Sequence, residues 1–261
     1  MATKSADIPQ SLNPAIDSRW YLQDRYYYAA ALFSIAAMYT GIRLYQGAFA
    51  LETGLDSTMP IFDVYWRRLF YIEIALEIVF AIGVTWYLWR TRDRNLEKLS
   101  TREEIRRYFT LVMWGGVYGL AVYFAGSYFG EQDNAWHQAA VRDTPLTPNH
   151  IVVFYLGFPL YTIIGMATWL YARTRLPLYA EKISLPLTLA VAGPFMLLPS
   201  VGYNEWGHTF WFREELFASP VHYGFVISVW FALALAGTIL QMVARMDVLL
   251  NRLALEPGGL G

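Results

Sequence analysis

The sequence contains no cysteine, which excludes disulfide bonds, thiolate metal sites and iron–sulfur clusters. Charged residues make up only 16% of its 261 residues, whereas soluble domains usually carry about 25%. The net charge of -1 gives no electrostatic reason to expect a nucleic-acid partner. The first 25 residues are polar and lack the apolar core of a cleaved signal peptide, so we expect the first membrane helix to direct targeting.

Apolar residues are abundant: 56% of the chain is hydrophobic and 17% is aromatic. Several apolar runs reach about 20 residues, the length that an α-helix needs to cross the hydrocarbon core. The sequence therefore predicts an all-α fold, a polytopic membrane bundle of about six transmembrane helices. The predicted spans are residues 26–49, 66–89, 108–129, 151–171, 184–203 and 221–243.

The linkers between these spans predict an orientation. Basic residues gather in the linkers after the second and fourth spans and in the tail, from Arg90 to Arg107, from Arg173 to Lys182, and at Arg245 and Arg252. Because cytoplasmic loops carry the excess of lysine and arginine, we expect both termini to be cytoplasmic. The predicted organisation is a polar cytoplasmic segment (1–25), a single helical membrane domain (26–245) and a short tail (246–261).

The chain contains four histidines, and they fall in two stretches with the same arrangement of residues. In each stretch a side chain with an oxygen precedes the first histidine by four residues, so both would lie on one face of a helix. The second histidine of each stretch follows a Thr-Pro or Ser-Pro pair, which is typical of a helix start. The two sets are Asp133, His137 and His150, and Asn204, His208 and His222. Both occupy loops on the outer side of the membrane in the predicted orientation.

Two imidazoles and one oxygen form an incomplete coordination shell, which leaves positions for water, dioxygen or substrate. Nitrogen and oxygen donors without sulfur suit copper, iron or zinc. Three alternatives remain open at this point: haem held between two helices, transient sites of a metal transporter, and ordinary hydrogen-bonded histidines near a membrane surface. Two matching triads at one membrane face favour two metal sites.

Three charges fall inside predicted spans: Arg43 in the first, and Glu73 and Glu77 in the second. Charges within a bilayer are expensive and are usually paired or functional. The simplest interpretation is an ion pair from Arg43 to Glu73 or Glu77 that holds the two spans together. The alternative is a proton or metal path toward the histidine stretches.

The histidine stretches and the segments around them resemble the C subunit of the copper membrane monooxygenases, the family of ammonia and particulate methane monooxygenases. The resemblance covers nearly the whole chain, from about residue 20 to 250. The matching segments are Gly54-Leu-Asp-Ser57, Thr91-Arg-Asp-Arg-Asn95, Glu131-Gln-Asp-Asn-Ala-Trp-His137, Val141-Arg-Asp-Thr144, Thr147-Pro-Asn-His150, Gly193-Pro-Phe-Met196, Asn204-Glu-Trp-Gly-His-Thr-Phe-Trp211 and Glu214-Glu-Leu-Phe217.

The resemblance implies that the chain is the membrane-embedded C subunit of a copper-dependent monooxygenase. Asp133, His137 and His150 would bind one copper and are the candidate catalytic residues, and Asn204, His208 and His222 would bind a second. The expected partners are the A and B subunits, arranged as a trimer of heterotrimers, with lipids, dioxygen and a small substrate. Quinol would supply the electrons. The expected location is a bacterial inner or intracytoplasmic membrane, with the copper sites toward the periplasm.

The substrate implied by the resemblance is ammonia, which would be oxidised to hydroxylamine. Segments closer to the ammonia-oxidising proteins are Arg106-Arg-Tyr-Phe109, Met113-Trp114, Val122-Tyr-Phe124, Phe158-Pro159, Tyr203 and Arg245-Met-Asp247. One alternative is the oxidation of methane or a short alkane by a member of the same family. Another is a non-catalytic scaffold or a protein that delivers copper within the complex.

Overall fold

The computed structural model of the chain describes residues 20–125, 136, 139–142, 144–196 and 233–256. These residues are helical almost throughout, and no strand is found among them; one isolated bridge joins Asp56 to Arg142. The all-α class predicted from composition is confirmed. The predicted sites Asp133, His137, Asn204, His208 and His222 lie outside the described residues.

The helices follow one another with short connections. Two long runs are continuous through a π-helical stretch: α2–η2–α3 covers Pro60–Arg90 and α6–η5–α7 covers Pro148–Arg175. The elements are η1 (Trp20–Leu22), α1 (Arg25–Thr53), α2 (Pro60–Phe62), η2 (Asp63–Arg67), α3 (Arg68–Arg90), η3 (Leu96–Lys98), α4 (Thr101–Tyr123), α6 (Pro148–His150), η5 (Ile151–Gly157), α7 (Phe158–Arg175), α8 (Pro177–Glu181), α9 (Leu185–Ala192), η6 (Gly193–Met196) and α12 (Ala236–Leu255).

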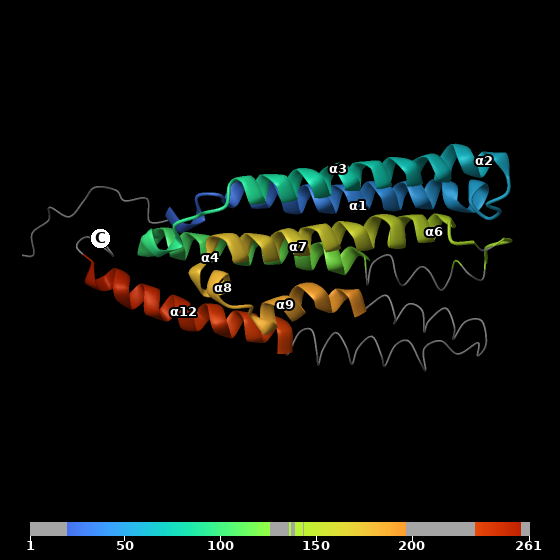
Figure 1. Cartoon of the computed structure of the whole chain (residues 1–261). Helices are drawn as coiled ribbons and strands as arrows, with labels where there is room; N and C mark the ends of the chain where they lie inside the picture. Colours follow the sequence, from blue (N-terminus) through green and yellow to red (C-terminus); the bar gives the residue numbers. More distant parts are fainter. Residues whose placement is uncertain (1–19, 126–135, 137–138, 143, 197–232, 257–261) are drawn as a thin grey trace, which may run out of the picture.

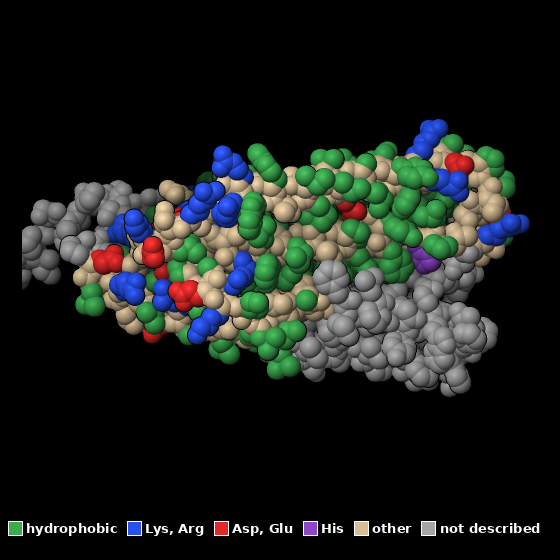
Figure 2. Space-filling view, viewed as in Figure 1, with side chains coloured by type: hydrophobic (Ala, Val, Ile, Leu, Met, Phe, Trp, Pro, Cys, Tyr) green, Lys and Arg blue, Asp and Glu red, His purple; other side chains and the backbone are tan. Residues whose placement is uncertain are grey.

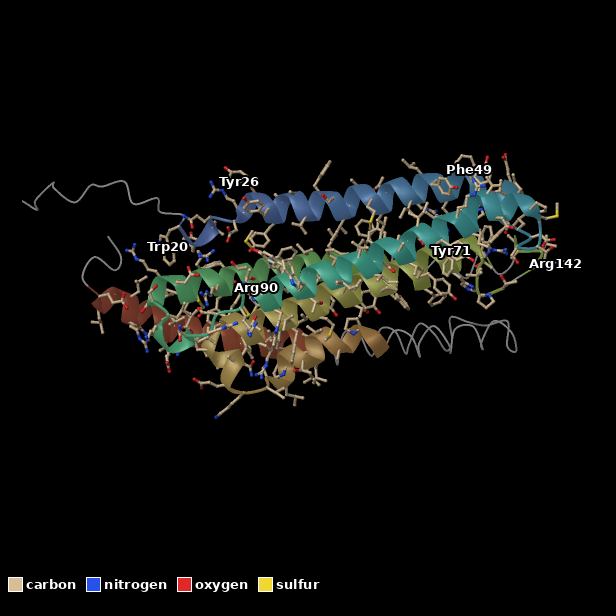
Figure 3. The ribbon with its side chains drawn as sticks, turned by 45° about the horizontal axis from the view of Figure 1, so that its top comes forward. Trp20, Tyr26, Phe49, Tyr71, Arg90 and Arg142 are labelled. Carbon is tan, nitrogen blue, oxygen red and sulfur yellow. The ribbon has the colours of Figure 1, made fainter. Side chains whose placement is uncertain are left out.

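The long helices lie roughly parallel in an elongated bundle and alternate in direction (Figure 1). At one end α1 finishes while α2 and α6 begin, and we call it the histidine end because α6 carries His150. At the other end α3 and α7 finish and α4 begins, and we call it the arginine end. Figure 3 shows Phe49 and Arg142 at the histidine end and Trp20 and Arg90 at the arginine end.

Three helical runs are long and apolar enough to cross a membrane: Pro60–Arg90, Pro148–Arg175 and Leu233–Leu255. α1 and α4 are long enough to cross a membrane, at 29 and 23 residues, but neither contains a stretch that is both sufficiently apolar and nearly free of charged residues. Among the described residues α9 and η6 cover only the first part of the predicted span 184–203. The fold is therefore a helical membrane bundle, and the count of six spans stays a prediction.

The core lies between α4 and α7, with α1 packed on α4 and α3 on α7. Its largest apolar cluster joins Tyr39 of α1 to Tyr118 of α4 and to Tyr161 of α7. Gly165 lets α7 approach α4 closely, because a β-carbon there would lie 2.7 Å from the Tyr118 ring. The Tyr118 hydroxyl donates to the carbonyl of Val191 at 2.9 Å, which fixes that ring in place.

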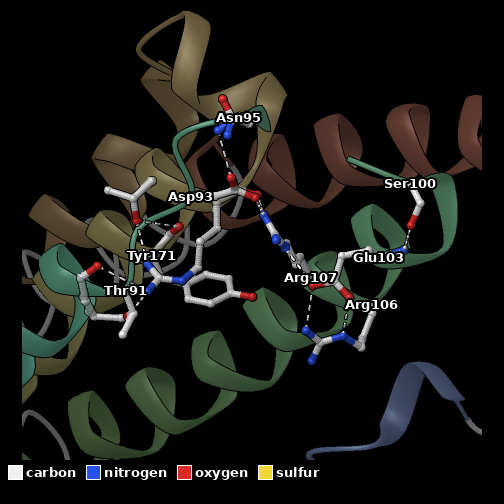
Figure 4. Close-up of polar contacts among 11 residues, drawn as sticks. Thr91, Asp93, Asn95, Ser100, Glu103, Arg106, Arg107 and Tyr171 are labelled. Atoms are coloured by element: carbon white, nitrogen blue, oxygen red, sulfur yellow. Dashed lines mark hydrogen bonds and ion pairs between the residues drawn. The ribbon is translucent and has the colours of Figure 1, made fainter. Parts of the chain in front are cut away.

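The arginine end is held by charged side chains (Figure 4). Arg106 and Arg107 both donate to the Glu103 carboxylate, at 2.7 and 2.9 Å, and Arg107 also pairs with Asp93 at 2.9 Å. Burial raises the pKa of Glu103, but the two guanidinium groups outweigh it and hold that pKa below its ordinary value.

In Figure 2 the middle of the molecule is largely apolar and the basic side chains gather toward its two ends.

The expected ion pair between the first two spans is not present in the described structure. Arg43 donates to Gln46 at 3.1 Å on its own helix, and no salt bridge among the described residues joins it to Glu73 or Glu77. Spans one and two are instead held together at the histidine end. There the Tyr45 hydroxyl donates to the carbonyl of Tyr65 at 3.0 Å, and Trp66 Nε1 donates to Thr53 Oγ1 at 2.9 Å.

Candidate metal site

His150 is the one predicted site residue that the described structure contains, and its position follows from a local helix start. Thr147 has extended backbone angles, and its hydroxyl oxygen accepts the His150 backbone N–H at 3.2 Å. Pro148 fills the first helical position, where its fixed φ suits a helix and its missing N–H does no harm. The sequence prediction of a helix start at Thr147-Pro148 is confirmed, and it sets His150 at the first turn.

The imidazole of His150 is oriented by a backbone carbonyl. Its Nδ1 lies 2.9 Å from the carbonyl oxygen of Thr144, and the side chain is buried at 8% exposure. A carbonyl oxygen can only accept a hydrogen bond, so Nδ1 carries the hydrogen. In the neutral ring the lone pair therefore lies on Nε2, which is the arrangement found in metal-binding histidines whose second nitrogen donates to a carbonyl.

An aromatic ring contacts the histidine along its own helix. The centre of the Phe154 ring lies 5.2 Å from that of the imidazole, in a tilted contact, and Phe158 meets Phe154 edge to face at 5.4 Å. Ile151, the next residue after His150, is fully buried in one cluster with Phe62, Trp66 and Trp136. Trp136 belongs to the first histidine stretch, so a described residue of that stretch and a neighbour of His150 share one apolar cluster.

The loops at the histidine end are tied to each other by backbone hydrogen bonds. Leu55, just after α1, accepts the N–H groups of Val141 and Arg142 at 2.9 and 3.1 Å, and Arg142 also pairs with Asp56 at 3.4 Å. The Thr58 hydroxyl and backbone N–H donate to Asp56 and lower the pKa of its carboxyl. These contacts hold the segment that leads to His150 against the end of α1.

Gly54 has a steric role at this junction. A β-carbon at this position would collide with the ring of Pro148 and would lie 2.7 Å from the Ala50 carbonyl oxygen. Only glycine allows the end of α1 to meet the start of α6 so closely. Gly54 belongs to one of the segments on which the sequence resemblance rests, and the structure supplies a physical reason for a glycine there.

Sequence reasoning missed the polar contacts beneath His150. Asn149 is fully buried, and its side-chain oxygen accepts from Gln46 Nε2 at 3.2 Å. Gln46 in turn accepts from Arg43, so a short polar chain leads from α1 to the residue beside His150. The Thr144 carbonyl was also missed, since a backbone acceptor leaves no mark in the sequence. For Asn149 the signal was its place inside the Thr-Pro-Asn-His segment.

The described residues fit a metal site in part. They contain no group of three or more histidine, aspartate, glutamate or cysteine side chains that could hold an ion. They do supply one buried imidazole in the tautomer that binds metals through Nε2. The other five predicted ligands lie outside the described residues, so the two triads stay a prediction.

Comparisons with known proteins agree with the resemblance seen in the sequence. The model of one family, the C subunit of ammonia monooxygenase/methane monooxygenase, matches residues 10–253. A search of the curated proteins finds no significant match. The family match includes both histidine stretches, the Gly54 junction and all of the helices named above except the last two residues of α12.

Proposed function

Because the chain belongs to the family of the C subunit of ammonia monooxygenase/methane monooxygenase, we propose that it is the membrane-embedded C subunit of a copper-dependent complex that oxidises ammonia to hydroxylamine. Family membership makes it one component of a multi-subunit monooxygenase. The observation that supports the metal-binding part is the orientation of His150 by the Thr144 carbonyl. Dioxygen and quinol-derived electrons would serve as the other reactants.

In this proposal Asp133, His137 and His150 hold one copper and carry the chemistry, while Asn204, His208 and His222 hold a second copper. The shared cluster of Trp136 and Ile151 supports a common site for the first triad. A copper bound there would supply dioxygen binding and one-electron chemistry.

The described residues around His150 would prepare its ring for this role. The Thr144 carbonyl fixes the tautomer and the Thr147 cap fixes the first turn of the helix. Phe154 packs against the imidazole and Phe158 packs against Phe154, so apolar surface lies beside the ring and keeps the local dielectric low. A rigid, dry and correctly protonated ligand needs little rearrangement when a metal binds.

We favour ammonia as the substrate because segments such as Arg106-Arg-Tyr-Phe109 and Phe158-Pro159 resemble those of ammonia-oxidising proteins. Methane is nearly the same size, so pocket dimensions alone do not separate the two. The proposed partners are the A and B subunits in a trimer of heterotrimers. The proposed location is a bacterial inner or intracytoplasmic membrane, with both termini cytoplasmic and the histidine end toward the periplasm.

Metal analysis and copper spectroscopy on the complex in native membranes test this function. The parent would be compared with His150→Ala and Asn204→Ala, and with Met166→Leu as a control on the same helical run as His150, at an exposed position. We expect His150→Ala to weaken copper binding on the order of 100-fold and to abolish ammonia oxidation. The control should keep both.

Two results would contradict the proposal. If His150→Ala loses its metal and still oxidises ammonia at the parent rate, the chain is a scaffold or a copper-delivery protein. If iron or zinc replaces copper in the parent, the cofactor assignment is wrong. Oxygen uptake with ammonia or methane, measured on the parent complex, decides between the two substrates.

A further inference from the structure

α3 buries acidic side chains where an apolar helix would normally bury leucine or valine. Of its 23 residues the buried ones are Glu73, Glu77 and Leu88. Only 11% of the most apolar stretch of the Pro60–Arg90 run is buried within the chain. The helix therefore turns apolar side chains outward and two carboxyl groups inward, toward η5 and α7.

Neither carboxyl group is compensated within the described structure. Both oxygens of Glu73 and one oxygen of Glu77 are buried with no hydrogen-bond partner among the described residues. The two residues are 4% and 7% exposed, so a side chain from a partner protein could not reach them without displacing this chain. They are four residues apart, which places them one above the other on one face of the helix.

The pair lies near the middle of the membrane. Glu73 follows Pro60 by thirteen residues, so it lies about 20 Å along the helix from the histidine end. Tyr39 of α1 precedes Thr53 by fourteen residues, which gives about the same depth. The Tyr39 hydroxyl lies within electrostatic range of both carboxyl groups, so three titratable groups from two helices meet at this level.

Four other charged or titratable side chains on neighbouring elements make contacts of their own. Arg43 of α1 donates to Gln46, and Arg67 of η2 pairs with Asp63 at 3.0 Å. Tyr155 of η5 packs against Phe70, and Tyr161 of α7 donates to the Pro194 carbonyl.

Another buried carboxylate shows how this chain stabilises such a group when its role is structural. Glu104 is 3% exposed, and Arg245 holds both of its oxygens at 2.8 and 3.0 Å. Two unpaired negative charges one helical turn apart in a low dielectric would be far more expensive than that pair. A bound proton removes the cost without any further partner.

We propose that Glu73 and Glu77 form a proton-binding site inside the membrane, which holds protons at neutral pH and supplies them to the oxidation at the histidine end. This role rests on the proposed function. Monooxygenation breaks the O–O bond, inserts one oxygen atom into the substrate and reduces the other to water. That water takes up two protons, and two electrons come from quinol. The polar chain Arg43–Gln46–Asn149 lies between the pair and His150 along α1.

Carbodiimide labelling of the parent complex in membranes tests proton binding without any variant. N,N′-dicyclohexylcarbodiimide modifies protonated carboxyl groups in apolar surroundings, and mass spectrometry of the peptides locates the label. We expect labelling at Glu73 or Glu77 and none at Glu104, which is equally buried but paired with Arg245. Infrared spectra should show a protonated carboxyl band that Glu73→Gln or Glu77→Gln reduces and Glu97→Gln, at an exposed position, leaves unchanged.

Turnover of the same variants tests proton supply. We expect Glu73→Gln to keep the parent copper content but to slow substrate-dependent oxygen uptake on the order of 100-fold. Absence of the label and of the infrared band overturns the proposal, as does a Glu73→Gln complex that turns over at the parent rate. Failure of the parent to oxidise ammonia or methane would instead contradict the proposed function, while the label and band would still decide proton binding.

Discussion

Two helical runs of this protein, Pro60–Arg90 and Pro148–Arg175, are built alike and buried differently. Both begin with proline at the histidine end, pass through a π-helical stretch and finish at the arginine end. The most apolar stretch is 11% buried in the first and 56% buried in the second. The first runs along the outside of the bundle, and beyond the buried rings of Phe62 and Trp66 at its start, its long helix α3 buries two carboxyl groups. The second lies at the centre and buries one imidazole and the aromatic rings of α7.

This difference shows that apolar composition does not reveal a helix's place in a membrane bundle. The most apolar stretches of the two runs have the same mean hydropathy. Lipid and protein interior are about equally apolar, so the outward side chains of α3 and the inward side chains of α7 satisfy the same preference. The place of a helix in the bundle is indicated by the residues that depart from the apolar pattern: small residues where helices touch, and polar residues that have a function.

The largest effect is expected from filling the contact between α4 and α7. Gly165→Leu should destabilise the protein by about 3 kcal/mol, because its side chain would collide with the fixed ring of Tyr118. The matched change Gly83→Leu on α3 should be nearly neutral, because nothing lies within 4 Å of a β-carbon there. Thermal unfolding of the complex in detergent measures both, and equal losses would contradict the central placement of α7.

A smaller effect is expected at the first turns of the two runs. Thr147→Val removes the hydroxyl that accepts the His150 N–H and should cost about 1 kcal/mol. If His150 binds copper, it should also weaken copper binding by about tenfold. Met59, the equivalent position of the other run, makes no side-chain cap, so Met59→Val should change neither quantity. Copper titration together with thermal unfolding checks the pair, and unchanged copper binding in Thr147→Val would show that the cap does not help to position His150.

The smallest effect concerns the arginine end, where Asp93, three residues after the first run, donates its N–H to the carbonyl of Thr174 in the second run at 3.2 Å. The Asn95 N–H and then Arg107 hold the pKa of the Asp93 carboxyl below its ordinary value. The contribution of the Asp93 carboxylate to the free energy of unfolding is therefore complete above the unfolded pKa of about 3.9 and is lost as the pH falls below that value. Asp93→Asn should remove less than about 1 kcal/mol of this acid-sensitive stability. Asp247→Asn, at an exposed position, serves as the control in unfolding scans from about pH 6 to about pH 3, in roughly unit steps.

The sequence predicted the helical class and the start of the helix at Thr147-Pro148, because a cap and a proline act within one turn. It did not predict which helix lies at the centre, since that depends on how the helices pack and not on their hydropathy. The expected pairing of Arg43 with Glu73 or Glu77 was wrong because intramembrane charges need not pair with each other. Arg43 donates to the nearby amide of Gln46, and the Glu73 carboxyl group is buried with no hydrogen-bond partner among the described residues.

The residue types of the candidate site could be predicted from the sequence, but the contacts that orient those residues could not. Histidine spacing pointed to His150, and the structure adds the carbonyl of Thr144 that orients its ring. Such a backbone acceptor can come from any residue, so only coordinates reveal it. The contact of Gly54 with Pro148 was visible in the sequence only as part of a resemblance, without a reason.

The π-helical stretch η5, Ile151–Gly157, separates His150 from the packed body of α7. A π turn contains an extra residue compared with an α turn. Each residue of an α-helix advances its side chains by about 100° around the axis, so one extra residue changes the rotational phase of everything before it. The angle at which His150 leaves the helix is thus set independently of the face that α7 presents to α4. The same bundle could present its histidine in a different direction through the gain or loss of one residue in this stretch.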